Sequence, residues 1–134
     1  MLAVIDKIQS LYQGRPVDLQ WDDCRVPLIL LDQYEERELW QPFNDLGHRH
    51  YPQTPTYSVS TFTSLCKLCV IMNEILNNIY TQRIQEHGLG SLAGHIKPLQ
   101  ARLTQWYDAL EDHLKFNASD PAQVVPPPSV LSLL

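Results

Sequence analysis

The sequence is short of cysteine and has no cluster of basic residues, and these shortages exclude several classes of protein. Its three cysteines, Cys24, Cys66 and Cys69, are too few and too unevenly spaced for a disulfide framework, which indicates a reducing compartment such as the cytosol or nucleus. No lysine or arginine is adjacent to another, so no patch could displace several counterions from a phosphate backbone. The net charge is −5, and direct nucleic-acid binding is not expected. The basic residues are Lys7, Arg15, Arg25, Arg37, Arg49, Lys67, Arg83, Lys97, Arg102 and Lys115.

The sequence also lacks an uninterrupted apolar run of membrane length. The longest apolar stretch, from Leu65 to Leu76, is shorter than the roughly 20 residues that a helix needs to cross a bilayer. It is interrupted by Lys67, Asn73 and Glu74. The N-terminal stretch carries Asp6 and Lys7 inside its apolar pattern, which is not typical of a secretory signal. The sequence therefore predicts a soluble protein with no membrane partner.

What is present is the composition of a folded domain. Of the 134 residues, 44% are hydrophobic and 19% are charged, which is too apolar for a disordered tail. A chain of this length buries about 70% of its unfolded surface on folding, so one core is expected.

Apolar residues recur every three positions near the N-terminus, at Leu2, Ile5, Ile8 and Leu11, and place an apolar stripe on one side of a helix over residues 2–12. Gly14 then stops the helix. Residues 17–57 form an arm that is mainly loop, with a short helical turn possible around 34–40. The arm contains several prolines, yet its aromatic residues should pin it to neighbouring helices. Those aromatic residues are Trp21, Tyr34, Trp40, Phe43 and Tyr51.

Two longer helices are predicted in the second half. One spans 59–86 and starts near Ser58 or Ser60, either of which could cap it; its apolar part should be buried on several sides. The other spans 92–115, with Pro98 causing a kink or with its start moved to Lys97. A proline spacer follows over 117–128, and the last apolar residues resemble the first turn of a further helix. The predicted fold class is all-α, an irregular helical bundle fragment with a long proline- and aromatic-containing arm, incomplete on its own.

Cys66 and Cys69 have the two-residue spacing of a zinc or redox motif, but no second cysteine pair exists to complete four ligands. His48 and His50 are the other residues that could in principle serve as zinc ligands. Because both cysteines lie in the most apolar helix, we interpret them as core residues. No metal site and no cofactor site are predicted in this chain.

No catalytic residues are predicted either. His48, Arg49 and His50 with Asp45 could suggest acid–base chemistry, but no nucleophile motif accompanies them, and a polar loop is the simpler interpretation. A group of acids in the arm is interpreted as a solvated face. These acids are Asp32, Glu35, Glu36 and Glu38.

Two short patterns have ordinary explanations. Gly88, Gly90 and Gly94 have a spacing reminiscent of a phosphate-binding loop, but no strand precedes them, so an interhelical break is predicted there. The run from Asn117 to Ser119 matches a glycosylation acceptor, which matters only in a secreted chain.

Several blocks, taken in order, resemble the middle regulatory region of the fungal zinc-cluster transcription factors. The run from Asp6 to Pro16 is similar to the opening of that region, and the stretch from Lys67 to Leu76 is similar to its long helix. The remaining matching residues are Asp32, Tyr34, Glu35, Glu38, Trp40, Pro42, Tyr51, Pro52, Ser60, Thr61, Phe62, Ile79, Tyr80, Trp106, Leu110, His113, Leu114 and Pro126 to Pro128. Pro98 and the loop from His48 to His50 depart from the pattern.

The resemblance implies a regulatory-domain fragment, over residues 1–134, of a nuclear transcription factor that controls metabolic genes, and no enzyme. Its partners would be the missing helices of the parent protein and a regulatory protein or small-molecule effector that shifts it between masked and exposed states. DNA binding and zinc would belong only to an N-terminal module with six cysteines, which this chain lacks.

One alternative is a stand-alone helical adaptor or scaffold that binds a partner helix. A cooperatively melting monomer would favour the adaptor, whereas aggregation would favour a fragment. A small hydrolase using His48 or His50 is the second alternative and the third hypothesis in all.

Overall fold

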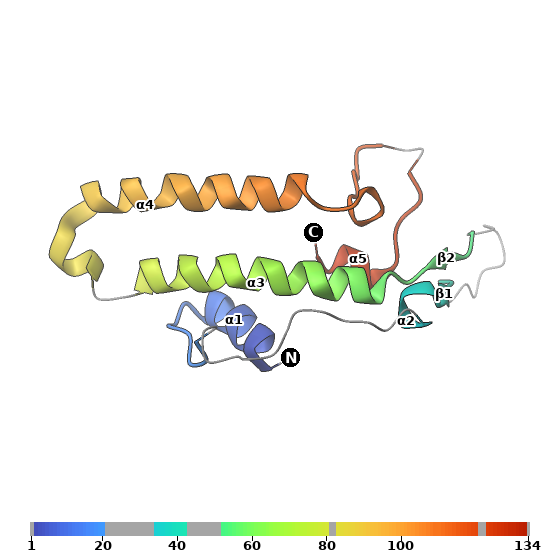
Figure 1. The fold of residues 1–134 in the computed structure, drawn as a ribbon, viewed down its shortest axis with the longest axis horizontal. Coiled ribbons are helices and arrows are strands. Elements are labelled where there is room, and N and C mark those ends of the chain that lie inside the picture. Colours follow the sequence, from blue (N-terminus) through green and yellow to red (C-terminus); the bar gives the residue numbers. More distant parts are fainter. Residues whose placement is uncertain (1, 21–33, 43–51, 81–82, 121–122, 134) are drawn as a thin grey trace. The chain divides into compact units, whose positions relative to one another are not determined.

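The computed structural model describes residues 2–20, 34–42, 52–80, 83–120 and 123–133, and these parts are mostly helical (Figure 1). The helices are α1 (Leu2–Gln13), α2 (Tyr34–Arg37), α3 (Ser58–Tyr80), α4 (Arg83–Asp108), the 3-10 helix η2 (Asp112–Leu114) and α5 (Pro128–Leu131). Strands β1 (Leu39–Trp40) and β2 (Thr54–Pro55) pair antiparallel, with Leu39 opposite Pro55 and Trp40 opposite Thr54. The all-α prediction is confirmed, apart from this small ribbon. The chain forms two compact units, Met1–Leu28 with Leu65–Ala109, and Ile29–Ser64 with Leu110–Leu134.

The first unit begins with α1, which ends as its sequence predicts. Gly14 takes a left-handed backbone conformation with φ of 65°. Its N–H donates to the carbonyl of Leu11 at 3.4 Å, and the Arg15 N–H donates to the carbonyl of Ser10 at 3.0 Å. This pair of bonds is the Schellman motif. Glycine is the usual residue at its left-handed position, because any other side chain would place a strained Cβ there. The chain therefore turns back along α1 over residues 15–20.

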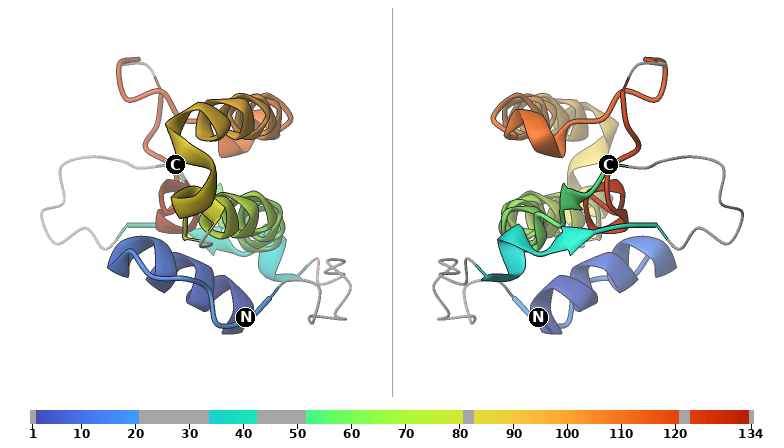
Figure 2. Two further views of the ribbon diagram at one scale, coloured as in Figure 1. Left: turned by 90° about the vertical axis from the view of Figure 1, so that its left-hand side faces the viewer. Right: turned by 90° about the vertical axis from the view of Figure 1, so that its right-hand side faces the viewer.

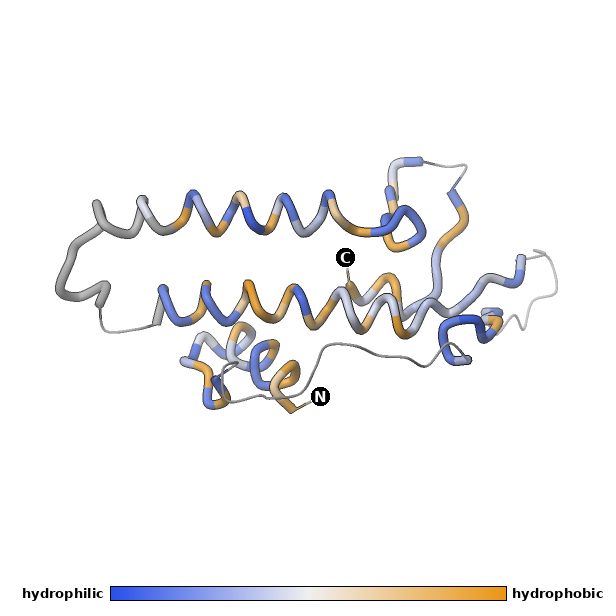
Figure 3. Tube along the Cα trace, viewed as in Figure 1, coloured by the Kyte–Doolittle hydropathy of each residue, from blue (hydrophilic) through white to orange (hydrophobic). Residues whose placement is uncertain are grey.

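In the first unit, α3 runs between α1 and α4, as the two end-on views show (Figure 2). Glu74 of α3 and Arg102 of α4 form an ion pair. Cys66, Cys69 and Leu76 are buried on α3, and so is Ile71. Cys69 and Ile71 are two residues apart and so lie on nearly opposite sides of the helix, and most other positions of its apolar part are half-buried. The apolar part of α3, whose hydropathy Figure 3 shows, is therefore buried on more than one side, as predicted.

The position of the break between the two long helices differs from the prediction. α3 ends at Tyr80 and α4 begins at Arg83, so Gly88, Gly90 and Gly94 lie inside α4 instead of forming the break. The intrinsic cost of glycine in a helix is about 1 kcal/mol per residue, which tertiary context routinely overrides. Pro98 also lies inside α4, so the helix does not begin at Lys97.

The second unit contains Leu110 and Leu114, which the sequence predicts to lie in the helix over residues 92–115. α4 ends at Asp108 rather than near 115, and Leu110 and Leu114 are buried through the turn around η2. Val130 and Leu133, around the one-turn helix α5, are buried as well. The helix stops early because these two leucines bury their side chains in a different unit from α4. Pro128 belongs to α5 and not to the spacer.

The structure describes two of the five aromatic residues that should pin the arm. Tyr34, in α2, is 82% exposed, so its ring is not packed into the core. Trp40 is half-buried in β1. Trp21, Phe43 and Tyr51 lie outside the described residues.

α3 also bears on the prediction about membranes. Its segment Ser58–Asn78 has the length and apolar composition of a membrane-crossing helix, with a mean hydropathy of 1.4, although the longest apolar run in the sequence is shorter. A buried helix of a soluble protein has the same properties, and a third of this segment is buried.

Candidate functional site

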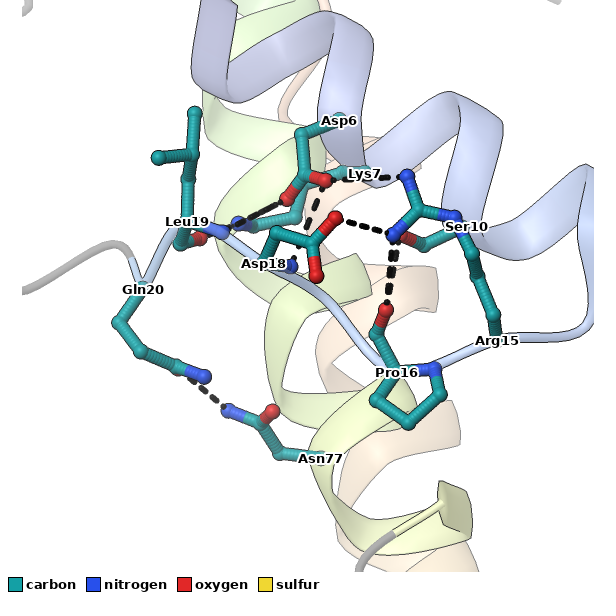
Figure 4. Close-up of polar contacts among 9 residues, drawn as sticks. All are labelled: Asp6, Lys7, Ser10, Arg15, Pro16, Asp18, Leu19, Gln20 and Asn77. Carbon is teal, nitrogen blue, oxygen red and sulfur yellow. Dashed lines mark hydrogen bonds and ion pairs between the residues drawn. The ribbon is translucent and has the colours of Figure 1, made fainter.

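A buried polar cluster lies between α1 and the segment that follows it; we call Asp6, Lys7, Ser10, Arg15 and Leu19 the α1 clamp (Figure 4). The Asp6 carboxylate accepts hydrogen bonds from the Asp18 N–H at 3.4 Å and the Leu19 N–H at 3.1 Å. It also lies 3.3 Å from Lys7 Nζ and 3.5 Å from Arg15. A carboxylate in this position holds the returning segment against the helix.

Lys7 is the most buried ionisable residue of the clamp, with no exposed surface. Its ammonium donates to the carbonyl of Leu19 and to Asp6. Ser10 adds a hydrogen bond from its hydroxyl to the carbonyl of Pro16 at 3.3 Å. Because a buried charge without a partner is costly, these bonds are what makes the burial of Lys7 possible.

The electrostatics of the clamp favour an ionised Asp6. Burial alone raises the pKa of Asp6, but hydrogen bonds from the Leu19 N–H, Lys7 and the Asp18 N–H, with the charge of Lys7, together lower it below 3.8. The carboxylate is therefore fully charged at neutral pH. The sequence does not predict this cluster, and its one local signal is that the charged residues Asp6 and Lys7 stand inside an apolar pattern.

The clamp turns the polar side of α1 inward and leaves its apolar stripe at the surface. Val4, Lys7 and Ser10 are buried, whereas Leu2 is 75% exposed and Leu11 is 53% exposed. The other members of the exposed stripe are Ile5, Ile8 and Tyr12. Amphipathic helices normally bury such a stripe, so this face is a candidate interaction surface.

Cys66 and Cys69 are both buried free thiols, as core packing predicts. Burial raises the pKa of both thiols, and for Cys69 burial and the charge of Cys66, partly offset by Lys7, raise it to about 11. Over the parts of the chain that the structure describes, no group of three or more His, Cys, Asp or Glu could hold a metal ion. Cys24 lies outside those parts.

The buried thiols should react slowly while the chain is folded. In a Cys24→Ser background at pH 8, a pKa of about 11 leaves only about a thousandth of Cys69 as thiolate. We expect maleimide labelling of Cys69 to be roughly 100-fold slower in the folded chain than in urea, measured by peptide mass spectrometry. Equal rates in both states would contradict the buried placement.

In the second unit, Glu36 caps α3. Its carboxylate accepts from the Val59 and Ser60 N–H groups, each at 2.9 Å, and from the Ser60 hydroxyl. Glu36 is therefore not part of a solvated face, and neither Ser58 nor Ser60 is needed as the cap. A carboxylate at this end also interacts favourably with the helix dipole.

Replacing Glu36 by alanine removes this cap and should lower the free energy of unfolding by about 1–2 kcal/mol. The matched control is Glu35→Ala, which changes an exposed carboxylate one residue away. Urea unfolding of the two variants measures the difference. Equal losses would show that the Glu36 carboxylate does not act as the cap.

Tyr57, just before α3, has an unusual conformation. Its φ of 51° is left-handed, which is rare for an aromatic residue. Its ring stacks on His113 with centroids 4.2 Å apart, and Glu111 Oε2 lies 3.2 Å from His113 Nε2. The stack and the Tyr57 N–H bond to the Glu36 carbonyl at 3.3 Å hold this residue in place.

Five of the remaining candidate residues, Asp32, Asp45, His48, Arg49 and His50, lie outside the described residues. Glu35 and Glu38 are exposed. Asn117 is exposed in a turn, where its side-chain carbonyl accepts from the Ser119 N–H at 3.0 Å.

Comparison with known proteins shows a distant similarity to a fungal protein. No family model and no solved structure matches the chain. It is similar to the nitrogen assimilation transcription factor nit-4 of Neurospora crassa, with 29% identity over 109 residues. These residues are 81% of this chain and 10% of nit-4, so the chain spans about a tenth of the length of that relative. The chain is thus distantly related to a fungal transcription factor.

Proposed function

We propose that this chain is a segment of the regulatory region of a fungal transcription factor of the zinc-cluster class. The observation that carries the proposal is the similarity to nit-4 over four-fifths of the chain. The blocks that resemble the zinc-cluster family include the run from Asp6 to Pro16. Of that run, Asp6, Lys7, Ser10 and Arg15 belong to the α1 clamp, and the Pro16 carbonyl accepts the Ser10 hydroxyl bond. The matching residues are therefore structural ones, as expected for a domain that regulates through contacts.

In this proposal the chain acts by binding and has no reaction to catalyse. The exposed stripe of α1 supports it, because a surface helix with its apolar side outward gains stability when another element covers it. The covering element would belong to the rest of the parent factor, and an effector that favours one arrangement would shift activity. DNA binding, zinc and nuclear localisation would be properties of the parent protein.

The test is a chimera in which this chain replaces the matching segment of Neurospora crassa nit-4. We expect the chimera to restore nitrogen assimilation to a strain that lacks nit-4, whereas a chimera carrying Asp6→Ala should restore much less. Protein levels of both are compared by immunoblot. A chimera that accumulates normally but fails to restore growth would contradict the proposal.

The stand-alone adaptor remains a distinguishable alternative. It predicts a monodisperse monomer that does not bind an exposed-hydrophobe dye, whereas a segment of a larger domain should bind the dye through the α1 stripe. Ile5→Gln together with Leu11→Gln should reduce dye binding if the stripe is responsible, because both side chains are exposed.

A further inference from the structure

Thr54 and its neighbours carry a sequence pattern that the proposed function does not use. Thr54–Pro55 is the only place in the sequence where a serine or threonine precedes a proline, and Pro52 stands two residues before Thr54. Proline-directed protein kinases recognise a hydroxyl residue followed by proline, because proline has no N–H to be satisfied at that position. A second proline two positions earlier is a further favourable feature.

The structure gives Thr54 an unusual environment in the second unit. It lies in β2 opposite Trp40, and side chains of paired residues lie about 5 Å apart on one face of a ribbon. The Thr54 hydroxyl oxygen is buried and has no hydrogen-bond partner among the described residues. A buried unpaired hydroxyl costs free energy and calls for an explanation, since most such groups are satisfied.

We propose that Thr54 is a phosphorylation site for a proline-directed serine/threonine kinase, and that its phosphate opens the β1–β2 ribbon. A two-stranded ribbon is marginally stable, and this one is two residues long in each strand, so brief opening exposes Thr54. Pro52 and Gln53 are already exposed. The Thr54 oxygen attacks the γ-phosphorus of ATP, the bond to ADP breaks, and the hydroxyl proton passes to the base of the kinase.

The phosphate prevents the ribbon from closing again. It carries a charge of about −1.5 to −2, and closure would press it against the half-buried Trp40 ring. The arm beside it also carries Glu35, Glu36 and Glu38, which repel a phosphate; Arg37 is the one basic residue of α2. Desolvation and repulsion therefore both favour the open state.

Opening would loosen the start of α3. The residues after Thr54 hold the arm by two bonds, from the Thr56 N–H to the Glu38 carbonyl at 2.8 Å and from the Thr56 hydroxyl to the Glu35 carbonyl at 2.6 Å. The Glu36 cap on Val59 and Ser60 lies on the same arm. Phosphorylation of Thr54 would therefore weaken the cap at the N-terminus of α3. This inference does not depend on the transcription-factor proposal.

The experiment treats the full chain with an activated mitogen-activated protein kinase and ATP. Peptide mass spectrometry should find one phosphate, on Thr54, and Pro55→Ala should lower the rate at least ten-fold, as should Thr54→Ala. In the phosphorylated chain, hydrogen exchange of the Thr56 and Tyr57 amides should be roughly ten-fold faster, while exchange at Cys69 in the first unit is unchanged.

Three results would overturn the inference. One is failure of the kinase to modify the folded chain although it modifies a peptide of residues 50–60, because the ribbon would then not open. Another is phosphorylation with unchanged exchange at Thr56. The third is slower exchange, which would mean that the phosphate pairs with Arg37 and closes the ribbon.

Discussion

Replacing Asp6 by alanine should lower the free energy of unfolding by about 3 kcal/mol, because it leaves the buried Lys7 ammonium without its carboxylate partner. The Asp18 and Leu19 N–H groups lose an acceptor at the same time. Since small domains have about 5–15 kcal/mol of stability in total, the loss is a large fraction of the free energy of unfolding, and the variant should unfold at a clearly lower urea concentration. Urea unfolding followed by far-ultraviolet circular dichroism measures the loss.

The matched control is Asp18→Ala. Asp18 pairs with Arg15 at 2.6 Å, but its side chain is 76% exposed, and such surface pairs contribute about 1 kcal/mol or less. A loss for Asp18→Ala as large as that for Asp6→Ala would mean that the clamp depends on Arg15 and not on the buried pair.

The lowered pKa of Asp6 also predicts the pH range of its contribution. In the unfolded chain the carboxyl binds its proton at higher pH than in the folded chain, so acid favours unfolding. The stabilisation by the charge of Asp6 is complete above the ordinary value of 3.8 and is lost as pH falls through the lower folded pKa. The stability difference between the natural chain and Asp6→Asn should therefore be constant from pH 5 to 7 and shrink below pH 4. A constant difference down to pH 2 would argue against an ionised Asp6.

Replacing Leu114 by alanine should cost about 3 kcal/mol in the second unit, because a leucine with 1% exposure leaves a cavity when it is truncated. Leu131→Ala is the control, since Leu131 is 40% exposed and should cost less than about 1 kcal/mol. The rate of hydrogen exchange at the Thr56 and Tyr57 amides measures the stability of the second unit. If Leu114→Ala costs no more than the control, Leu114 is not part of that core.

Asp6→Ala and Leu114→Ala should each destabilise a different unit of the chain. Asp6 stabilises a turn in the first unit through polar contacts, whereas Leu114 stabilises the second unit through apolar burial. If the units unfold separately, each substitution should change the exchange of its own unit more than that of the other. A two-state analysis would then describe neither unit correctly.

Local chemistry alone determined the helical class, the end of α1 and the buried state of Cys66 and Cys69. Helical periodicity depends on side chains a few residues apart, and Gly14 can adopt positive φ at no steric cost, so these features can be predicted from the sequence. The short helical turn at α2 and the apolar turn at α5 were predictable for the same reason.

Only the tertiary structure decided which side of α1 faces inward, where the long helices break, and which residue caps α3. Asp6 reaches N–H groups 12 and 13 residues away, and Glu36 reaches the start of α3 from 23 residues away, so no local pattern predicts either contact. The free energy of satisfying those distant N–H groups outweighs the preference of an apolar stripe for the interior. In the same way, the burial of Leu110 and Leu114 in the second unit ends a helix that periodicity alone would continue.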